Sequence, residues 1–364
     1  MSLLIELIAN LPTMIVLGLN LMIFFASTNY QKINRSKKTP AVSVIIAAWN
    51  EGKRIGRCVN SILNLDYPKD KIEIIVVGGG TDDTGTVCKQ LAGKGTIKYI
   101  EEKKRSGKWF ALNRGVNNAK CNYVAFTDAD GVVCKNWLKN LASHDDADII
   151  TSPALALHDD NQIGRCFSVA SAYNYLVAYG LTKFFNASTF SGVGSFMKKS
   201  VAKEIKFEKG CVEDYKFCWR AVNKGYRVKT DPQAPVYQGR PKTFNDWRKC
   251  YLRLFHGFMN DMILLKDPFS LLLLLIGVLT LISNVVRIIY TGFSLGSFLA
   301  MNFAILAVSL ANLFMLSRMY ESNKYILFFP YLFLYYIFVQ LVGVESFFRW
   351  ITKRDIGWPI YNKT

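Results

Sequence analysis

The sequence has no pair of cysteines in a CxxC spacing, although eight cysteines occur among its 364 residues. Such pairs hold structural zinc, so the pattern argues against a zinc site. The chain is also too long for a small scaffold stapled by disulfides. All eight cysteines lie between Cys58 and Cys250. Free thiols in this region are typical of a protein domain in a reducing cytoplasm.

Charge is nearly absent from both ends of the chain. Residues 1–30 contain no Lys or Arg and a single acid, Glu6, and residues 268–348 contain only three basic residues. Residues 31–267 therefore carry 38 of the 45 basic and 23 of the 27 acidic side chains, a net charge of +15 out of +18. With 51% hydrophobic residues, a disordered chain is excluded. The sequence thus divides into a charged middle between apolar ends.

Four apolar segments have the length of about 20 residues that crossing a bilayer requires. They are Leu3–Ala26, Pro268–Tyr290, Leu295–Ser317 and Tyr325–Phe347. No basic stretch precedes the first and no small-residue cleavage site follows it, which favours an uncleaved anchor over a signal peptide. The alternative for the last three is a set of buried helices in a soluble core, but the short loops between them argue for transmembrane helices.

Basic residues beside the first apolar segment predict its orientation. Lys32, Arg35, Lys37 and Lys38 follow it directly, so the positive-inside rule places the charged domain in the cytoplasm. Three further spans would put the basic tail, which begins at Arg349, on the opposite side. One segment would then be re-entrant or lie in the interface. We expect an integral membrane protein of a prokaryotic plasma membrane.

The charged domain alternates apolar, β-branched runs with helix-like stretches. The predicted strands are Val42–Ala47, Ile72–Val77, Ile97–Ile100, Tyr123–Thr127 and Asp148–Ser152. The predicted helices between them are Glu51–Leu65, a helix capped by Thr81, Asp82 or Asp83 that runs through Leu91, and Phe110–Ala119. This order predicts an α/β fold with a mostly parallel sheet, whose ligands bind at the carboxyl ends of the strands.

Polar side chains follow the strand that ends at Thr127. Asp128 and Asp130 form an Asp-x-Asp there. Two close carboxylates suit Mg²⁺ or Mn²⁺, which can bridge a diphosphate, whereas the alternative is a solvated turn. Lys108, before the third helix, is a candidate phosphate contact or else a surface lysine.

Two downstream segments carry further candidates. Glu213 and Asp214 begin a helix-like run that extends to Val222, where a carboxylate acts either as a general base or as a simple partner of the helix dipole. Arg253 lies in Asn245–Leu265, whose apolar residues recur at helical spacing. This segment predicts a helix at the membrane surface, with arginines that anchor to lipid headgroups or bind phosphate.

Seven segments between Pro40 and Phe258 resemble, in order, a membrane-bound glycosyltransferase of family 2. They are SVIIAAWNEGKRIGRCVNSIL, IIVVGGGTDDT, RSGKWFALNRG, YVAFTDADG, SGVGSFMKKSV, VEDYKFCWRAVNKGYRV and PKTFNDWRKCYLRLFHG. The resemblance implies the GT-A fold, a Rossmann-like mixed sheet. It also implies a nucleotide-sugar donor such as a UDP- or GDP-sugar, a divalent metal, and transfer with inversion at the anomeric carbon.

The resemblance also implies roles for individual residues. Asp130 would bind Mg²⁺ or Mn²⁺, Asp128 would contact ribose or the metal, and Asp214 would be the catalytic base. The metal and Arg253 would stabilise the charge that grows on the leaving diphosphate. The expected substrate-binding residues are Ala48, Asn50, Glu51, Asp82, Lys108, Asn113, Asp128, Gly194, Glu213 and Arg253.

Two departures from the family pattern affect the expected substrates. Gly78 and Gly79 stand where the family carries an Asp that contacts the base, so base recognition would pass to the Ala48–Glu51 turn or to Asp82. The Gln-x-x-Arg-Trp motif is Cys250–Leu254 here, which keeps only its arginine. Because that motif accompanies chain-extending synthases, its erosion favours transfer of one sugar to a lipid acceptor.

These expectations divide the chain into five parts. They are an anchor (1–30), a cytoplasmic GT-A catalytic domain (31–244), an amphipathic interface helix (245–267), transmembrane helices (268–348) and a basic tail (349–364). The alternatives are a processive polysaccharide synthase and a non-catalytic membrane scaffold. No nucleic-acid motif is present, and attraction to anionic lipid explains the same positive charge.

Overall fold

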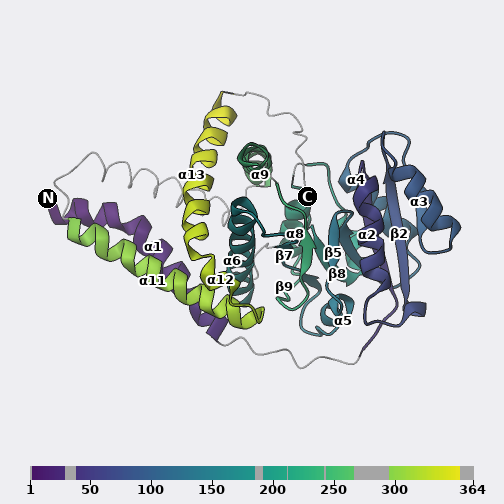
Figure 1. Ribbon diagram of the computed structural model, residues 1–364, viewed down its shortest axis with the longest axis horizontal. Coiled ribbons are helices and arrows are strands. Elements are labelled where there is room, and N and C mark those ends of the chain that lie inside the picture. The colour runs from purple at the N-terminus through teal and green to yellow at the C-terminus, as the bar shows by residue number, and fades with distance from the viewer. Residues whose placement is uncertain are drawn as a thin grey trace.

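The computed structural model describes residues 2–28, 38–184, 192–210, 212–241, 243–265 and 295–352. An α/β part lies at one end, and long helices form the rest (Figure 1). The strands are β1 (Val42–Trp49), β2 (Ile72–Gly79), β3 (Lys98–Glu101), β4 (Tyr123–Asp128), β5 (Gly131–Val133), β6 (Ile149–Thr151), β7 (Ala154–Ala156), β8 (Gly194–Lys198), β9 (Val228–Thr230) and β10 (Val236–Gln238). The helices of the α/β part are α2 (Gly52–Leu63), η1 (Lys69–Lys71), α3 (Thr84–Gly93), α4 (Lys108–Asn118), α5 (Trp137–Leu141), α7 (Lys199–Ile205) and α8 (Glu213–Asn223).

The main sheet has seven strands in the order β3-β2-β1-β4-β8-β6-β9. β1 pairs in parallel with β2 and β4, β2 with β3, and β6 with β9, whereas β8 is antiparallel to both of its neighbours. All five predicted strands are present, and the prediction of a mostly parallel α/β sheet is confirmed. The carboxyl ends of β1, β2, β3 and β4 therefore lie along one edge.

Apolar side chains cover both faces of this sheet. β1 is buried along most of its length, and its residues alternate between two core clusters. Ile46 belongs to the cluster that includes residues of α2, α3 and α5, and Ile45 to the cluster that includes residues of α4, α7 and α8. The helical spacing of Ile55, Val59 and Ile62 places all three inside. Helices thus cover both faces of the sheet.

A second sheet lies beside the end of β4. Its order is β5-β10-β7, and Gln238 at the end of β10 pairs with Gly131 of β5. Since Gly131 follows Asp130 directly, this pairing brings Gln238 to the Asp-x-Asp segment. These strands have three residues each, too few for the sequence pattern to reveal.

Long helices make up the remaining part. They are α1 (Ser2–Thr28), α6 (Gln162–Phe184), α9 (Phe244–Leu265), α11 (Leu295–Met319), α12 (Lys324–Leu327) and α13 (Phe329–Ile351). α1 and α11 lie side by side, and α13 packs against α6 and α9 (Figure 1). At their centre Trp247 of α9 is fully buried, stacked on Phe338 and tilted against Phe167. The helical part therefore has its own core.

The predicted apolar segments have different outcomes. Leu3–Ala26 and Leu295–Ser317 lie within α1 and α11, and Tyr325–Phe347 is divided between α12 and α13. Pro268–Tyr290 lies outside the described residues, as do Lys32, Arg35, Lys37 and the tail from residue 353. Across the residues that are described, no helix is both long and apolar enough to cross a membrane.

Candidate active site

Two carboxylates converge at the end of β4. Asp128 is the last residue of the strand, and Asp130 is only 2% exposed. The amide nitrogen Nε2 of Gln238 donates to Oδ2 of Asp128 at 3.1 Å and to Oδ1 of Asp130 at 3.0 Å. The amide hydrogens thus lie between two negative groups, where they offset the repulsion of the carboxylates.

The same place fits a divalent cation. Which end of a side-chain amide is nitrogen depends on its hydrogen bonds, so rotation of the Gln238 amide would present its oxygen beside the two carboxylates. Oxygen ligands of this kind suit Mg²⁺ or Mn²⁺, and Mg²⁺ typically takes one or two carboxylates together with substrate phosphates. No group of three or more His, Cys, Asp or Glu side chains forms a metal site in the described ranges. Asp128, Asp130 and Gln238 are therefore the residues that would hold the ion.

Lys108 links these carboxylates to α8. Its Nζ lies 2.6 Å from Oδ1 of Asp128 and 3.6 Å from Oε1 of Glu213. Burial alone would lower the pKa of Lys108, but the carboxylates of Asp128, Glu213 and Asp214 outweigh it and raise the pKa. The ammonium group therefore stays charged, and an incoming phosphate would meet a fixed cation.

The pair at the start of α8 completes this group of charges. Glu213 is 8% exposed, and burial raises its pKa, partly offset by Lys108. Oδ2 of Asp214 accepts a hydrogen bond of 2.9 Å from the backbone N–H of Gly192, and Oδ1 accepts one from Tyr215 N–H. A Cβ on Gly192 would stand 2.7 Å from Oδ2. The close approach of Gly192 thus fixes the Asp214 carboxylate beside the other charges.

A separate cluster forms where β1 and β2 end. Asn50 has a φ of 58°, and its Oδ1 accepts from Thr81 N–H at 2.8 Å. The carboxylate of Glu51 pairs with Arg54 at 2.8 Å. The carboxylate of Asp82 accepts from the N–H groups of Gly52 and Thr84, which offset the effect of burial and lower its pKa. These hydrogen bonds join the turn after β1 to the turn after β2.

The backbone around Gly78, where the resembling family carries an Asp, leaves no space for a side chain. A Cβ on Gly78 would lie 1.7 Å from the carbonyl oxygen of Ala48, its neighbour in β1. No side chain fits at position 78 with this backbone.

Three further residues are predicted to bind substrate, and one of them, Gly194, pairs with Thr127, directly before Asp128. Asn113 uses its amide to donate to the carbonyl of Phe207 and to accept from the N–H of the same residue. Gly194 begins β8, and a Cβ there would meet the side chain of Ser152 at 2.6 Å. Arg253 is half-buried on α9.

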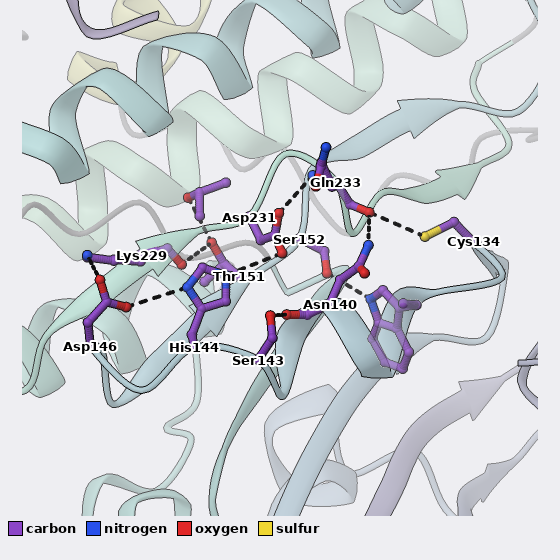
Figure 2. A network of polar contacts seen from close by, with 12 residues as sticks. Cys134, Asn140, Ser143, His144, Asp146, Thr151, Ser152, Lys229, Asp231 and Gln233 are labelled. Atoms are coloured by element: carbon purple, nitrogen blue, oxygen red, sulfur yellow. Dashed lines mark hydrogen bonds and ion pairs between the residues drawn. The ribbon is translucent and has the colours of Figure 1, made fainter. Parts of the chain in front are cut away.

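Ser152 belongs to a group of polar residues around β6 and β9, at the end of the main sheet opposite β3 (Figure 2). Its hydroxyl accepts from the Trp137 indole at 2.8 Å. The buried His144 ring lies between Asp231, at 3.2 Å, and Asp146, at 3.5 Å. The contact between His144 and Asp231 connects the loop before β6 with the loop after β9.

Comparison with known proteins finds sequence similarity to one enzyme family in the α/β part. Residues 43–206 match the family model of glycosyl transferase family 2. A probable glycosyltransferase, YdaM of Bacillus subtilis (strain 168), is 27% identical over 255 residues, covering 63% of this chain and 57% of that protein. The poly-beta-1,6-N-acetyl-D-glucosamine synthase of Staphylococcus aureus (strain COL) is 25% identical over 236 residues, with the same coverages. The chain thus spans little more than half of the curated relatives that it matches.

A solved structure resembles nearly the whole chain in fold. The mannosyltransferase PcManGT from Pyrobaculum calidifontis, solved with GDP-Man and Mn²⁺, has a TM-score of 0.67 at 19% identity. It covers 96% of this chain and 100% of its own. The sequence matches make the α/β part similar to family 2 glycosyltransferases, and the structural match supports the predicted mixed, mostly parallel GT-A-like sheet.

Proposed function

We propose that this chain is a family 2 glycosyltransferase that moves one sugar from a nucleotide-sugar to a membrane lipid, with inversion at the anomeric carbon. The acceptor would be a polyprenyl phosphate, a lipid-linked sugar or a glycolipid. One observation carries the proposal: the convergent carboxylates of Asp128 and Asp130 lie in one charged group with Lys108 and the Asp214 carboxylate.

Asp214 is assigned the role of general base when the acceptor is a hydroxyl. Its carboxylate takes the proton from the hydroxyl, and the acceptor oxygen attacks the anomeric carbon from the face opposite the diphosphate. The bond from the anomeric carbon to the diphosphate oxygen breaks, and its electron pair leaves with the nucleoside diphosphate. The N–H groups of Gly192 and Tyr215 hold the carboxylate in position for this step.

Lys108 and Arg253 are assigned to the leaving group. The Lys108 ammonium already lies beside Asp128, where a diphosphate would bind, and its charge would stabilise the negative charge that develops there. When bound by Asp128, Asp130 and Gln238, Mg²⁺ or Mn²⁺ would supply the same kind of electrostatic stabilisation. The similar mannosyltransferase was solved with GDP-Man and Mn²⁺, which supports a nucleotide-sugar donor and a divalent metal ion for this chain.

The membrane acceptor is supported by exposed apolar stripes on the helical part. On α11 the stripe is Phe303, Leu306, Leu310 and Phe314, and on α13 it is Leu334, Leu341 and Phe348. Residues at these spacings share one face of a helix. Exposed apolar surface of this extent marks a contact with another phase or protein, and the excess of basic residues suits an anionic lipid surface. We assign the contact to the cytoplasmic face of a membrane.

A processive polysaccharide synthase is the second candidate. The similarity to the poly-beta-1,6-N-acetyl-D-glucosamine synthases favours it. The loss of Gln and Trp around Arg253 counts against it, since that motif accompanies chain extension. Product length separates the two functions, because a synthase yields polymer from the same donor.

The function is tested by a screen of labelled nucleotide-sugars with membranes that contain the full chain. We expect label from one donor to enter the lipid phase, to depend on Mg²⁺ or Mn²⁺, and to add a single sugar per acceptor. Label in a polymer would favour the synthase. Membranes that transfer no sugar from any donor would overturn the proposal and favour the scaffold.

The membrane contact has its own test in vesicle flotation. Leu310→Asp changes an exposed leucine of the α11 stripe, which is 42% exposed, and Leu63→Asp changes a leucine on α2 that is 39% exposed. We expect only the first to reduce flotation with anionic vesicles. Equal flotation of both variants would contradict the assigned contact.

A further inference from the structure

The ends of three neighbouring strands bring Trp49, Gly79 and Glu102 together. Trp49 of β1 pairs with Gly79 of β2, and the N–H of Glu102, directly after β3, donates to the carbonyl of Gly78 at 2.7 Å. Ala47 and Ile100 belong to the core cluster that includes residues of α4. Because side chains alternate along a strand, Trp49 and Glu102, each two residues further on, are placed on this face.

Gly79 leaves the middle of this row without a side chain. A Cβ there would lie 2.5 Å from the carbonyl oxygen of Glu102 and 3.7 Å from Cζ3 of Trp49. The indole ring therefore lies close to bare backbone, with Glu102 on the next strand. Trp49 is only partly buried, and an aromatic ring can stack on a nucleotide base.

Glu102 is buried without the partners that a carboxylate normally has. It is 8% exposed, and its Oε1 has no hydrogen-bond partner within the described part of the chain. Burial raises its pKa, and the charge of Arg114 offsets this only in part. Its neighbour Glu101 is ordinary by comparison, since its side chain is 46% exposed and pairs with Lys89 at 2.9 Å. An unsatisfied buried acceptor costs free energy that a ligand can recover.

Trp49, Gly79 and Glu102 lie about one nucleoside diphosphate away from the carboxylates of Asp128 and Asp130. β3, β2, β1 and β4 are adjacent in the sheet, and Ala47 of β1 pairs with Asp128 of β4. Three strand spacings separate the end of β3 from the end of β4, about 14 Å. This is the length scale of a nucleoside diphosphate, with its base beside Glu102 and its phosphates beside Lys108.

We propose that Glu102 reads the base of the donor and selects guanine over uracil. The inference rests on the proposed function and adds the nucleotide to it. The Watson–Crick edge of guanine carries two adjacent donors, N1–H and the N2 amino group, and a carboxylate accepts both with its two oxygens. Uracil has one N–H between two carbonyl oxygens, so the second oxygen of a carboxylate would face a carbonyl. Glu102 thus contacts the base in place of the Asp that the resembling family carries near position 78.

The test is calorimetric binding of GDP and UDP to the full chain in the presence of Mn²⁺. We expect the wild-type chain to bind GDP about tenfold or more tightly than UDP. Glu102→Gln replaces one acceptor oxygen by a donor of similar size, so it removes this preference mainly by weakening GDP. Glu101→Gln, next in sequence but exposed and on the other face, serves as the matched control and keeps the preference.

The outcomes separate this inference from the function on which it rests. If the chain binds UDP as tightly as GDP, or if Glu102→Gln keeps the preference for GDP, the role of Glu102 is overturned while the proposed function stands. If neither nucleotide binds, both are overturned. Thermal unfolding of Glu102→Gln without nucleotide checks its fold, and Glu102→Ala provides a second variant that also lacks the acceptor.

Discussion

The ammonium nitrogen of Lys108 lies 2.6 Å from Oδ1 of Asp128. The contact joins the first residue of α4 to the last residue of β4, and the same ammonium reaches Glu213 at 3.6 Å. A single cation thus offsets the repulsion of two acids before any substrate is present. We infer that a diphosphate would compete with these carboxylates for Lys108.

Replacing Lys108 by Met removes this cation and leaves Glu213 buried beside Asp128 and Asp214. We expect a loss of about 1–2 kcal/mol in the free energy of unfolding, a figure reduced for the exposed third of the lysine side chain. Nucleotide binding should also weaken. Chemical denaturation measures the first effect, with Lys89→Met as the control, since Lys89 forms an ion pair that is largely exposed. Equal stability of the two variants would contradict the role of Lys108.

Replacing Gln238 by Leu tests the proposed metal site. Without the amide, Asp128 and Asp130 repel each other, so we expect the metal-free protein to lose about 1–3 kcal/mol of stability. The rise in the thermal midpoint on addition of Mn²⁺ should be smaller than in the wild type, because one oxygen ligand is gone. Gln238→Glu is the informative companion. It should be less stable without metal but gain more from Mn²⁺. An unchanged Mn²⁺ shift in Gln238→Leu would remove Gln238 from the site.

Replacing Gly192 by Ala displaces the proposed base. The new methyl group would stand 2.7 Å from Oδ2 of Asp214, so the carboxylate must move and its hydrogen bond from residue 192 must weaken. We expect sugar transfer to fall about tenfold or more while nucleotide binding is retained. Gly56→Ala on α2 is the control, because a Cβ there meets nothing within 4 Å. Activity equal to that of the control would show that Asp214 needs no fixed position.

Glu102→Gln should change the dependence of stability on pH. Burial raises the pKa of Glu102 above its ordinary value of 4.5, so the folded protein resists ionisation of this group more than the unfolded chain does. Below pH 4.5 the acid is neutral in both states and carries no penalty. As the pH rises through the folded pKa, the charged form destabilises the wild type, whereas glutamine does not titrate. Denaturation at several pH values should show the variant gaining relative stability toward neutral pH. A difference independent of pH would contradict the prediction.

The sequence predicts what is local and misses what depends on long-range pairing. The run before Asp128 is apolar and β-branched, so its strand and the position of the Asp-x-Asp at the strand end follow from the pattern. Gln238 lies 108 residues from Asp130, and it reaches the site only because β10 pairs with β5. No local signal marks it, apart from its position at the end of a short apolar run.

The turn that contains Gly78 shows a second kind of feature that the sequence alone does not explain. The sequence reveals that residue 78 lacks the acid of the family pattern, but the cause is the carbonyl of Ala48 on the neighbouring strand. The buried state of Glu102 is hidden for the same reason. The sequence Glu101-Glu102 shows two acids, and only the pairing of β3 with β2 distinguishes the exposed one from the buried one.

The most direct test of the account is sugar transfer by Asp214→Asn. The asparagine keeps the size of the side chain but cannot accept the proton of the acceptor. We predict that transfer to a hydroxyl acceptor falls by about 10²–10⁴-fold, while the donor still binds and the exposed Asp70→Asn control transfers normally. Transfer by Asp214→Asn at the wild-type rate would contradict the mechanism.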